Sequence, residues 1–225
     1  GGIRVEVQFS ESARFFHAPH TERVRPLQPG VSCIPAHLTE FAGTIGALLL
    51  SGGRTFLVSC NHVLALNHPA AVGQLVYQPA WIDGGTPADQ VGVVTHFDPI
   101  ELGVINRRDL ALAEVFLPDP VNLTPLDFSS PPLEAYRVPD IGEVVFKSGR
   151  TTGFTSGLVV EVNALVNVDY PPPIGRISWS GTTRALRMQS GASSLRTFDA
   201  RSFPWLEVPR ETHALHRGGC NPPQR

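Results

Sequence analysis

Short apolar runs separated by turn residues make up most of this chain. The runs lie at residues 43–50, 55–60, 74–78, 90–97, 110–116, 143–148, 157–162 and 165–168. The turn signals between them are rich in glycine, aspartate and proline and lie at residues 51–53, 83–85 and 118–120. No long stretch keeps a helical period, and short strands at this spacing are typical of a β-barrel or a β-sandwich. The pattern therefore predicts an all-β protein.

The same pattern divides the chain into five segments. Residues 1–30 form an N-terminal leader segment, and residues 31–117 form a first β-barrel that carries most of the strand-like runs. Proline is dense and apolar periodicity lapses over residues 118–139, which predicts a linker. Residues 140–200 predict a second, partial β-barrel. Strand alternation is lost over residues 201–225, which form an aberrant tail.

Size and charge narrow the classes of function. The 225 residues suit one large β domain or two small ones, and 42% of them are apolar, which is enough for a packed core. A net charge of −2 offers no electrostatic attraction to nucleic acid or to an anionic membrane. The longest apolar stretch, residues 45–50, is far shorter than the ~20 residues that span a bilayer. We therefore expect no nucleic-acid partner and no membrane span.

The three cysteines, Cys33, Cys60 and Cys220, are too few and too unevenly spaced for a disulfide framework. Their sparse use favours a reducing compartment. The chain begins with two glycines and shows no basic-then-apolar leader that would indicate a signal peptide. By default we expect a cytoplasmic location.

Two of the apolar runs each deliver one titratable residue. His62 follows the run at 55–60, and Asp109 precedes the run at 110–116. Imidazole, with an unperturbed pKa of about 6.5, suits a general base, and a buried carboxylate can fix its tautomer and orientation. The order His then Asp predicts a third partner, a serine in a downstream Gly-Asp-Ser-Gly-like turn. The 225 residues contain no such turn.

Three groups of motifs, in chain order, carry a family resemblance. Those around His62 are residues 29–32 (Pro-Gly-Val-Ser), 43–47 (Gly-Thr-Ile-Gly-Ala) and 59–65 (Ser-Cys-Asn-His-Val-Leu-Ala). Those leading to Asp109 are residues 78–79 (Gln-Pro), 83–85 (Asp-Gly-Gly), Ile100 and 106–113. The third group is residues 147–157 (Lys-Ser-Gly-Arg-Thr-Thr-Gly-Phe-Thr-Ser-Gly). Over residues 29–168 this ordered set resembles the trypsin-like serine peptidases, specifically a bacterial branch that lacks the disulfides of the secreted digestive enzymes.

The resemblance implies two antiparallel β-barrels with the active site in the cleft between them. It implies that His62 is the general base and Asp109 its orienting carboxylate in a serine endopeptidase that hydrolyses peptide bonds by acyl transfer. The partner would be a peptide or protein substrate, with no cofactor and no metal. The family's nucleophile turn would follow residues 200–203, where residues 204–212 (Pro-Trp-Leu-Glu-Val-Pro-Arg-Glu-Thr) stand instead. The nucleophile is therefore unknown, and we expect the second barrel to be incomplete at its C-terminus.

Other residues offer weaker chemistry. The replacement nucleophiles that we considered are Ser190, Ser193, Ser202 and Cys220, and none has the flanking glycines, acidic neighbour and following strand of a nucleophile turn. Two sets have zinc-ligand residue types, namely His17 and His20 with Cys33 and His37, and His213 and His216 with Cys220. Both sets lie in proline-rich sequence without a clear pattern. Residues 150–153 contain glycine but lack the Gly-Lys-Ser/Thr ending of a phosphate loop.

Three interpretations of the missing turn stay open. In the first, a reading-frame fault near Phe203 replaces the nucleophile segment of a serine peptidase. In the second, the chain is an inactive pseudo-peptidase that binds peptides or proteins. In the third, the chain is an unrelated β-sandwich binding protein; His62 is then a structural or surface residue, and Asp109 caps a turn beside Arg107 and Arg108. Sequence does not predict substrate specificity or oligomeric state.

Overall fold

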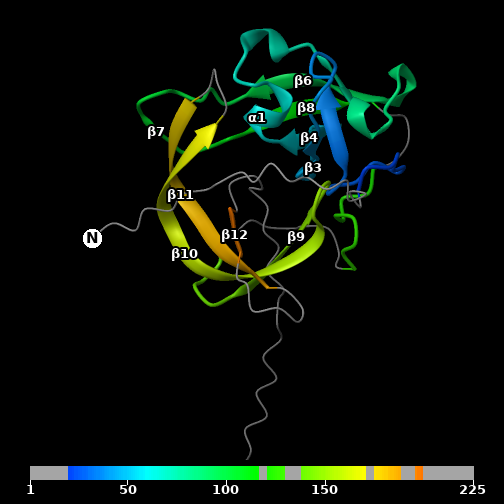
Figure 1. The fold of residues 1–225 in the computed structure, drawn as a ribbon. Helices are drawn as coiled ribbons and strands as arrows, with labels where there is room; N and C mark the ends of the chain where they lie inside the picture. The colour runs from blue at the N-terminus through cyan, green and yellow to red at the C-terminus, as the bar shows by residue number, and fades with distance from the viewer. Residues whose placement is uncertain (1–19, 117–120, 130–137, 171–174, 189–195, 200–225) are drawn as a thin grey trace, which may run out of the picture.

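The computed structural model describes residues 20–116, 121–129, 138–170, 175–188 and 196–199. These residues form two antiparallel sheets, one of seven strands and one whose main path has four, joined by short helical turns (Figure 1). The all-β prediction is therefore confirmed. No helix among the described residues is long and apolar enough to cross a membrane.

The first sheet contains the strands of the first subdomain. They are β1 (Ser32–Pro35), β2 (Gly43–Thr44), β3 (Ala47–Ser51), β4 (Arg54–Ser59), β5 (Leu75–Tyr77), β6 (Gln90–Phe97) and β8 (Ala111–Val115). Their order in the sheet is β2-β1-β5-β6-β8-β4-β3, and all the pairings are antiparallel. The central strand β8 therefore pairs with β4 on one side and with β6 on the other. This pairing brings the end of β4 close to the start of β8.

The second sheet is dominated by one long hairpin. Its strands are β9 (Val144–Gly149), β10 (Gly153–Tyr170), β11 (Gly175–Met188) and β12 (Arg196–Asp199), in the order β12-β11-β10-β9. Strand β7 (Ile105–Asn106) comes from the first subdomain and pairs in parallel with β11. Figure 1 shows this sheet curled into an open half-barrel beside the first sheet. A β-strand contact therefore links the two halves of the molecule.

Four short helical turns connect the strands. They are α1 (Asn61–Leu64), η1 (Pro69–Ala71), η2 (Trp81–Asp83) and η3 (Pro87–Asp89). Both η1 and η3 begin with a proline, whose fixed φ and missing N–H suit the first position of a helix. In η3 a capping box joins Thr86 and Asp89. Helix α1 begins two residues after the end of strand β4.

The main hydrophobic core lies within the first sheet. Its buried members are Leu27, Val31, Cys33, Ile45, Leu48, Leu57, Leu64, Val76, Val91, Val94, Ala111 and Ala113. Leu27 comes from the segment that sequence analysis assigned to the leader, and Leu123 and Leu126, from the expected linker, pack against the same core. The main-chain N–H of Leu126 donates a hydrogen bond to the carbonyl of Pro29 over 2.9 Å. Both segments therefore contribute side chains to the first barrel.

The observed strands differ from the predicted runs in several places. The run at 43–50 is interrupted, because the N–H of Ile45 donates to the carbonyl of Val31 (2.9 Å) and the N–H of Gly46 to that of Val58 (2.9 Å). The runs at 157–162 and 165–168 belong to a single strand, β10, which carries register shifts between them. Strand β11 was not predicted, because its sequence is polar for most of its length.

Candidate active site

His62 lies on α1, immediately after β4. The preceding residue, Asn61, is fully buried and holds this short helix in place. Its Nδ2 donates to the carbonyl of Asp98 (2.7 Å) and to Oδ1 of Asn67 (3.1 Å), and its Oδ1 accepts from the N–H of Asn67 (2.7 Å). The side chain of Asn67 in turn bonds both main-chain groups of Ile100. The helix that carries His62 is thus attached to the chain at residues 98–100.

Asp109 lies two residues before β8 and reaches His62 because of strand register. Ala111 of β8 pairs with Ser59 of β4, so the residues beyond these two strand ends emerge side by side. The carboxylate of Asp109 is bound twice by the same residue. Its Oδ2 accepts a hydrogen bond from Nδ1 of His62, and its Oδ1 accepts from the main-chain N–H of His62 over 3.2 Å. These two contacts fix the imidazole and the carboxylate relative to each other.

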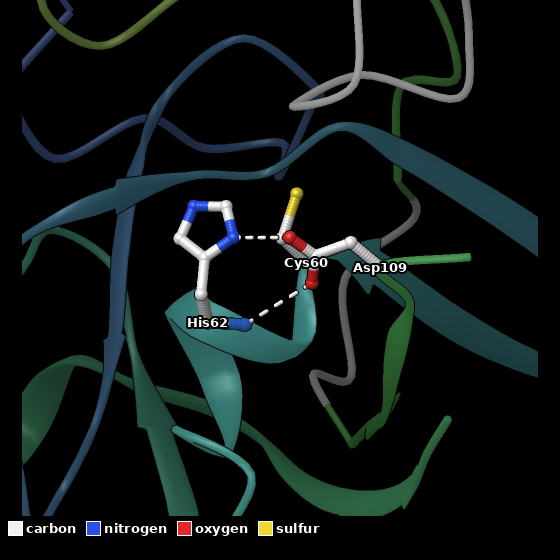
Figure 2. A group of neighbouring side chains, drawn as sticks. All are labelled: Cys60, His62 and Asp109. Atoms are coloured by element: carbon white, nitrogen blue, oxygen red, sulfur yellow. Dashed lines mark hydrogen bonds and ion pairs between the residues drawn. The ribbon is translucent and has the colours of Figure 1, made fainter. Parts of the chain in front are cut away.

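The electrostatics of this pair follow from its burial. The Asp109 side chain is 4% exposed, whereas that of His62 is 28% exposed. A carboxylate oxygen accepts the bond, so Nδ1 carries the hydrogen and Nε2 is the nitrogen that can take a proton. Figure 2 shows Nε2 on the side of the ring that faces away from Asp109. The arrangement can act as a base at Nε2 while Asp109 stabilises the resulting imidazolium.

Cys60 is a third member of this cluster, and sequence analysis did not select it. Its Sγ lies with the ligand atoms of His62 and Asp109 in a group whose atoms are all within 4.8 Å of one another (Figure 2). Burial raises the pKa of the Cys60 thiol well above its ordinary value, and the charge of Asp109 and the neighbouring Cys33 raise it further. A thiol held protonated is a poor nucleophile. The feature of the sequence that could have pointed to Cys60 is its position two residues before His62.

A Ser–His–Asp grouping lies away from this cluster, where His20 contacts Asp127 and Ser148 of β9. His20 Nε2 lies 2.6 Å from Oδ2 of Asp127, and its Nδ1 lies 3.2 Å from Oγ of Ser148 and 3.0 Å from the carbonyl oxygen of Gly30. A carbonyl can only accept, so Nδ1 is the donor there and cannot take a proton from Ser148. Both His20 and Ser148 are buried. This grouping therefore fastens residues 20–30 to the second sheet.

The remaining sequence candidates have other positions. Cys33 lies in the main core, and burial raises its pKa to about 12. Partial burial and the neighbouring His68 lower the pKa of His37. Within the described part of the chain, the group of His, Cys, Asp or Glu side chains close enough to share an ion is Cys60, His62 and Asp109, and it contains neither Cys33 nor His37. The other candidates from the sequence lie outside the described residues; they are His17, Ser190, Ser193, Ser202, His213, His216 and Cys220.

Solved structures with a similar fold are serine proteases. A glutamic acid-specific serine protease described as using a histidine triad in substrate binding matches with a TM-score of 0.50 and 19% identity, over 76% of this chain and 79% of that chain. A Thermobifida fusca protease A matches with a TM-score of 0.47 and 19% identity, over 79% of each chain. A Nocardiopsis protease matches with a TM-score of 0.47 and 19% identity, over 78% of this chain and 80% of that chain. No family model and no curated protein sequence matches.

The similarity to the glutamic acid-specific protease, at a TM-score of 0.50, defines the fold. The chain has the chymotrypsin-like double-barrel architecture, which confirms the predicted all-β fold of two antiparallel barrels. The β-sandwich fold of the third interpretation is wrong, because the two sheets follow a double-barrel arrangement. At 19% identity the likeness extends to the fold alone.

Proposed function

We propose that His62 and Asp109 are the general base and orienting carboxylate of a serine endopeptidase site that cleaves peptide bonds by acyl transfer. The observation that carries this proposal is the double contact of Asp109 with His62, at Nδ1 and at the main-chain N–H, on a chymotrypsin-like fold. A buried carboxylate held in this way presents the opposite nitrogen of the imidazole to a hydroxyl nucleophile. The substrate class would be a peptide or protein.

The reaction needs two further components. A serine hydroxyl must lie within hydrogen-bond reach of Nε2 of His62, and it attacks the scissile carbonyl as its proton passes to that nitrogen. Two main-chain N–H groups must then bind the developing oxyanion, each contributing on the order of 3 kcal/mol. A glycine-rich Gly-Asp-Ser-Gly turn would supply the serine and the donors. The 225 residues do not contain that turn.

We infer that a reading-frame fault near Phe203 accounts for this gap. Strand alternation ceases in the sequence where the nucleophile turn should begin, and the residues that follow are rich in arginine, proline and glycine. An off-frame translation of a GC-rich gene produces such a composition. On this view the intended protein is a serine endopeptidase, and the chain with its present tail lacks the nucleophile.

The experiment has two stages. The gene is sequenced across the codons for residues 196–225 and translated in three frames, and we expect one frame to encode Gly-Asp-Ser-Gly and further apolar strands. The chain with its present tail and the frame-restored chain are then treated with a fluorophosphonate probe. We expect labelling of a serine only in the frame-restored chain. Labelling of the chain with its present tail would contradict the frame-fault inference.

Variants of the frame-restored chain test the two named residues. We expect His62→Ala to abolish labelling and Asp109→Asn to lower turnover by roughly 10⁴-fold, because the wrong tautomer then faces the nucleophile. His96→Ala is the matched control, since His96 is exposed and its ring pairs with the side chain of Asp98 rather than with that of Asp109. Full activity of the His62→Ala variant would overturn the assignment of the base.

The alternative function is peptide or protein binding without cleavage. The absence of the nucleophile turn from the sequence favours it, because the described residues form both sheets without that turn. It predicts cooperative unfolding of the chain with its present tail and measurable affinity for peptides without turnover. If no reading frame encodes the turn, this alternative becomes the leading one. Non-cooperative unfolding of the purified chain would exclude it.

A further inference from the structure

Three kinds of metal ligand meet beside the first helix. Cys60 offers a thiol, His62 an imidazole nitrogen and Asp109 a carboxylate, and their ligand atoms lie within 4.8 Å of one another. We propose that this cluster is a binding site for a thiophilic divalent cation of the Zn²⁺ class. The ligands would be Sγ of Cys60, Nδ1 of His62 and one carboxylate oxygen of Asp109. The proposal does not rest on peptidase activity, because it needs neither a nucleophile nor an oxyanion hole.

The distances suit such an ion after a small adjustment. Tetrahedral zinc binds sulfur at about 2.3 Å and nitrogen or oxygen at about 2.0–2.2 Å, so its ligand atoms are separated by roughly 3.5 Å. The atoms of the cluster lie close enough together to reach that separation. Nδ1 of His62 and Oδ2 of Asp109 are now in hydrogen-bond contact, and no pair in the group is further apart than 4.8 Å. Side-chain rotations that move these atoms by about an ångström would separate Nδ1 of His62 from Oδ2 of Asp109 and bring Sγ of Cys60 to bonding distance of the ion.

The set of ligands selects the class of ion. Carboxylate and carbonyl oxygens alone would favour Mg²⁺ or Ca²⁺, whereas a thiolate with an imidazole favours Zn²⁺ and its analogues Co²⁺ and Cd²⁺. Three protein ligands leave the fourth tetrahedral position open to water, as in zinc sites that keep an exchangeable ligand. Cys60 is 2% exposed and the side chain of Asp109 is 4% exposed, and the 28% exposure of the His62 side chain provides the side from which the ion would enter.

The surrounding structure holds two of the ligands in place. The main-chain N–H of His62 donates to Oδ1 of Asp109, which leaves the other oxygen of the carboxylate to face the ion. The buried side chain of Asn61, between Cys60 and His62 in sequence, bonds to the carbonyl of Asp98 and so anchors the turn that presents them. Hydrogen bonds of this kind orient metal ligands and commonly raise their affinity by 10–100-fold.

The ion and the base role exclude each other. A cation bound to Nδ1 takes the place of the hydrogen that His62 now donates to Asp109, and the neutral imidazole then carries its hydrogen on Nε2, where it can no longer accept a proton. The thiol proton of Cys60 leaves to solvent as its sulfur binds the ion. The carboxylate then binds the metal instead of orienting the imidazole. In a frame-restored chain that cleaves peptides, we therefore expect Zn²⁺ to inhibit, and Cys60→Ser to relieve the inhibition.

The test uses Co²⁺ as the spectroscopic probe and the chain with its present tail, carrying Cys220→Ser so that only the two buried thiols are present. We expect one equivalent of Co²⁺ to produce a sulfur-to-cobalt charge-transfer band in the near ultraviolet and the visible bands of a tetrahedral site. Added Zn²⁺ should remove both. Failure to produce the charge-transfer band at millimolar Co²⁺ would overturn the proposal.

Matched variants assign the ligands. Cys60→Ser is expected to abolish the charge-transfer band, and Asp109→Asn to weaken Co²⁺ binding at least tenfold. Cys33→Ser is the control, because Cys33 is the other buried thiol and lies outside the cluster; its band should persist. Circular dichroism checks the fold of each variant, and Cys60→Ala replaces Cys60→Ser if the latter does not fold. A band that survives loss of Cys60 would overturn the proposal. Because no turnover is measured, failure here leaves the peptidase proposal standing, and an inactive frame-restored chain leaves the metal proposal standing.

Discussion

Arg150 and Asp83 form a buried ion pair between the two barrels. Arg150 lies in the turn between β9 and β10, and its Nε donates to Oδ2 of Asp83 over 2.9 Å while its Nη2 bonds Oδ1 of the same carboxylate. The main-chain N–H of Arg150 also donates to Oγ1 of Thr44 in β2 over 3.1 Å. The Asp83 side chain is only 4% exposed, and Oγ of Ser32 donates to it as well. Asp83 belongs to the first barrel and Arg150 to the second. The ion pair between them thus contributes to the orientation of the two barrels around the candidate site.

Asp83→Asn is expected to lower the free energy of unfolding by about 1–3 kcal/mol, because the guanidinium of Arg150, whose side chain is 19% exposed, loses its charged partner. Urea unfolding followed by circular dichroism measures this change. Asp169→Asn is the control, since Asp169 pairs with Arg176 on the surface and both side chains are more than half exposed. Such an exposed pair contributes little to stability, because solvent screens its charges. Equal losses in the two variants would show that the inter-barrel pair has no special role.

Asn61→Ala is expected to destabilise the turn that carries His62. The substitution removes the hydrogen bonds of Asn61 to the N–H of Asn67 and to the carbonyl of Asp98, at a cost of about 0.5–1.5 kcal/mol for each lost bond. Amide hydrogen exchange should show faster exchange at residues 61–67 than in strand β6. Uniform exchange throughout the first barrel would instead indicate a global loss of stability.

Gly43→Ala is expected to disturb the packing of the same helix. A Cβ at residue 43 would lie 2.1 Å from Cγ1 of Val63, the residue after His62, so one of the two must move. Overpacking of this kind typically costs about 1–3 kcal/mol. The double variant Gly43→Ala with Val63→Ala removes the clashing methyl groups and should recover part of the loss. Thermal unfolding of both variants and of Val63→Ala alone measures the coupling between the two sites, and simple additivity would refute the clash.

The two buried thiols are expected to resist alkylation in the folded chain. Burial raises the pKa of Cys33 to about 12, so its thiolate fraction near pH 8 is roughly 10³-fold below that of an ordinary cysteine. Cys60 is held protonated by its burial and by Asp109. Iodoacetamide labelling followed by peptide mass spectrometry should therefore modify both residues readily in denaturant and very slowly without it. Rapid labelling of Cys60 in the native chain would show that its surroundings open to solvent.

Asp89 is expected to make stability depend on pH. Its burial acts to raise its pKa, but hydrogen bonds from Oγ1 and N–H of Thr86 and from Arg23 together hold the pKa below its ordinary value. A carboxylate with a lowered pKa in the folded state binds fewer protons than in the unfolded state, where its pKa is about 3.9. Its stabilisation is therefore complete above that pH and is lost as pH falls through the folded pKa.

Comparison with Asp89→Asn isolates this contribution. The difference in unfolding free energy between the unmodified chain and the variant should be larger at pH 6 than at pH 2.5. Urea unfolding at both pH values provides the measurement. If the difference in unfolding free energy is the same at both pH values, the charge of Asp89 does not stabilise η3, and only its ability to accept hydrogen bonds matters.

Local pattern was sufficient for most of the first barrel. The bounds of strands β4, β6 and β8 lie within one residue of the predicted runs. Successive side chains of a strand point to opposite faces of the sheet, so a half-buried strand shows as an alternation of apolar and polar residues in the sequence. The parts of the fold whose sequence lacks such a pattern could not be predicted in the same way. Strand β11 has a polar sequence and is held by its neighbours β10 and β12, so its extended conformation depends on pairing with distant residues.

By itself the sequence determined the all-β class and selected His62 and Asp109 as residues that could work together, since each stands at the end of an apolar run. Only the tertiary structure decided that Cys60 joins them and that Asp83 meets Arg150. It also decided that Leu27 and Leu126, in segments without strand pattern, pack in the first barrel's core. These contacts depend on strand register and on the docking of one barrel against the other. Neither can be inferred from a local window, because both are set by packing between residues far apart in the chain.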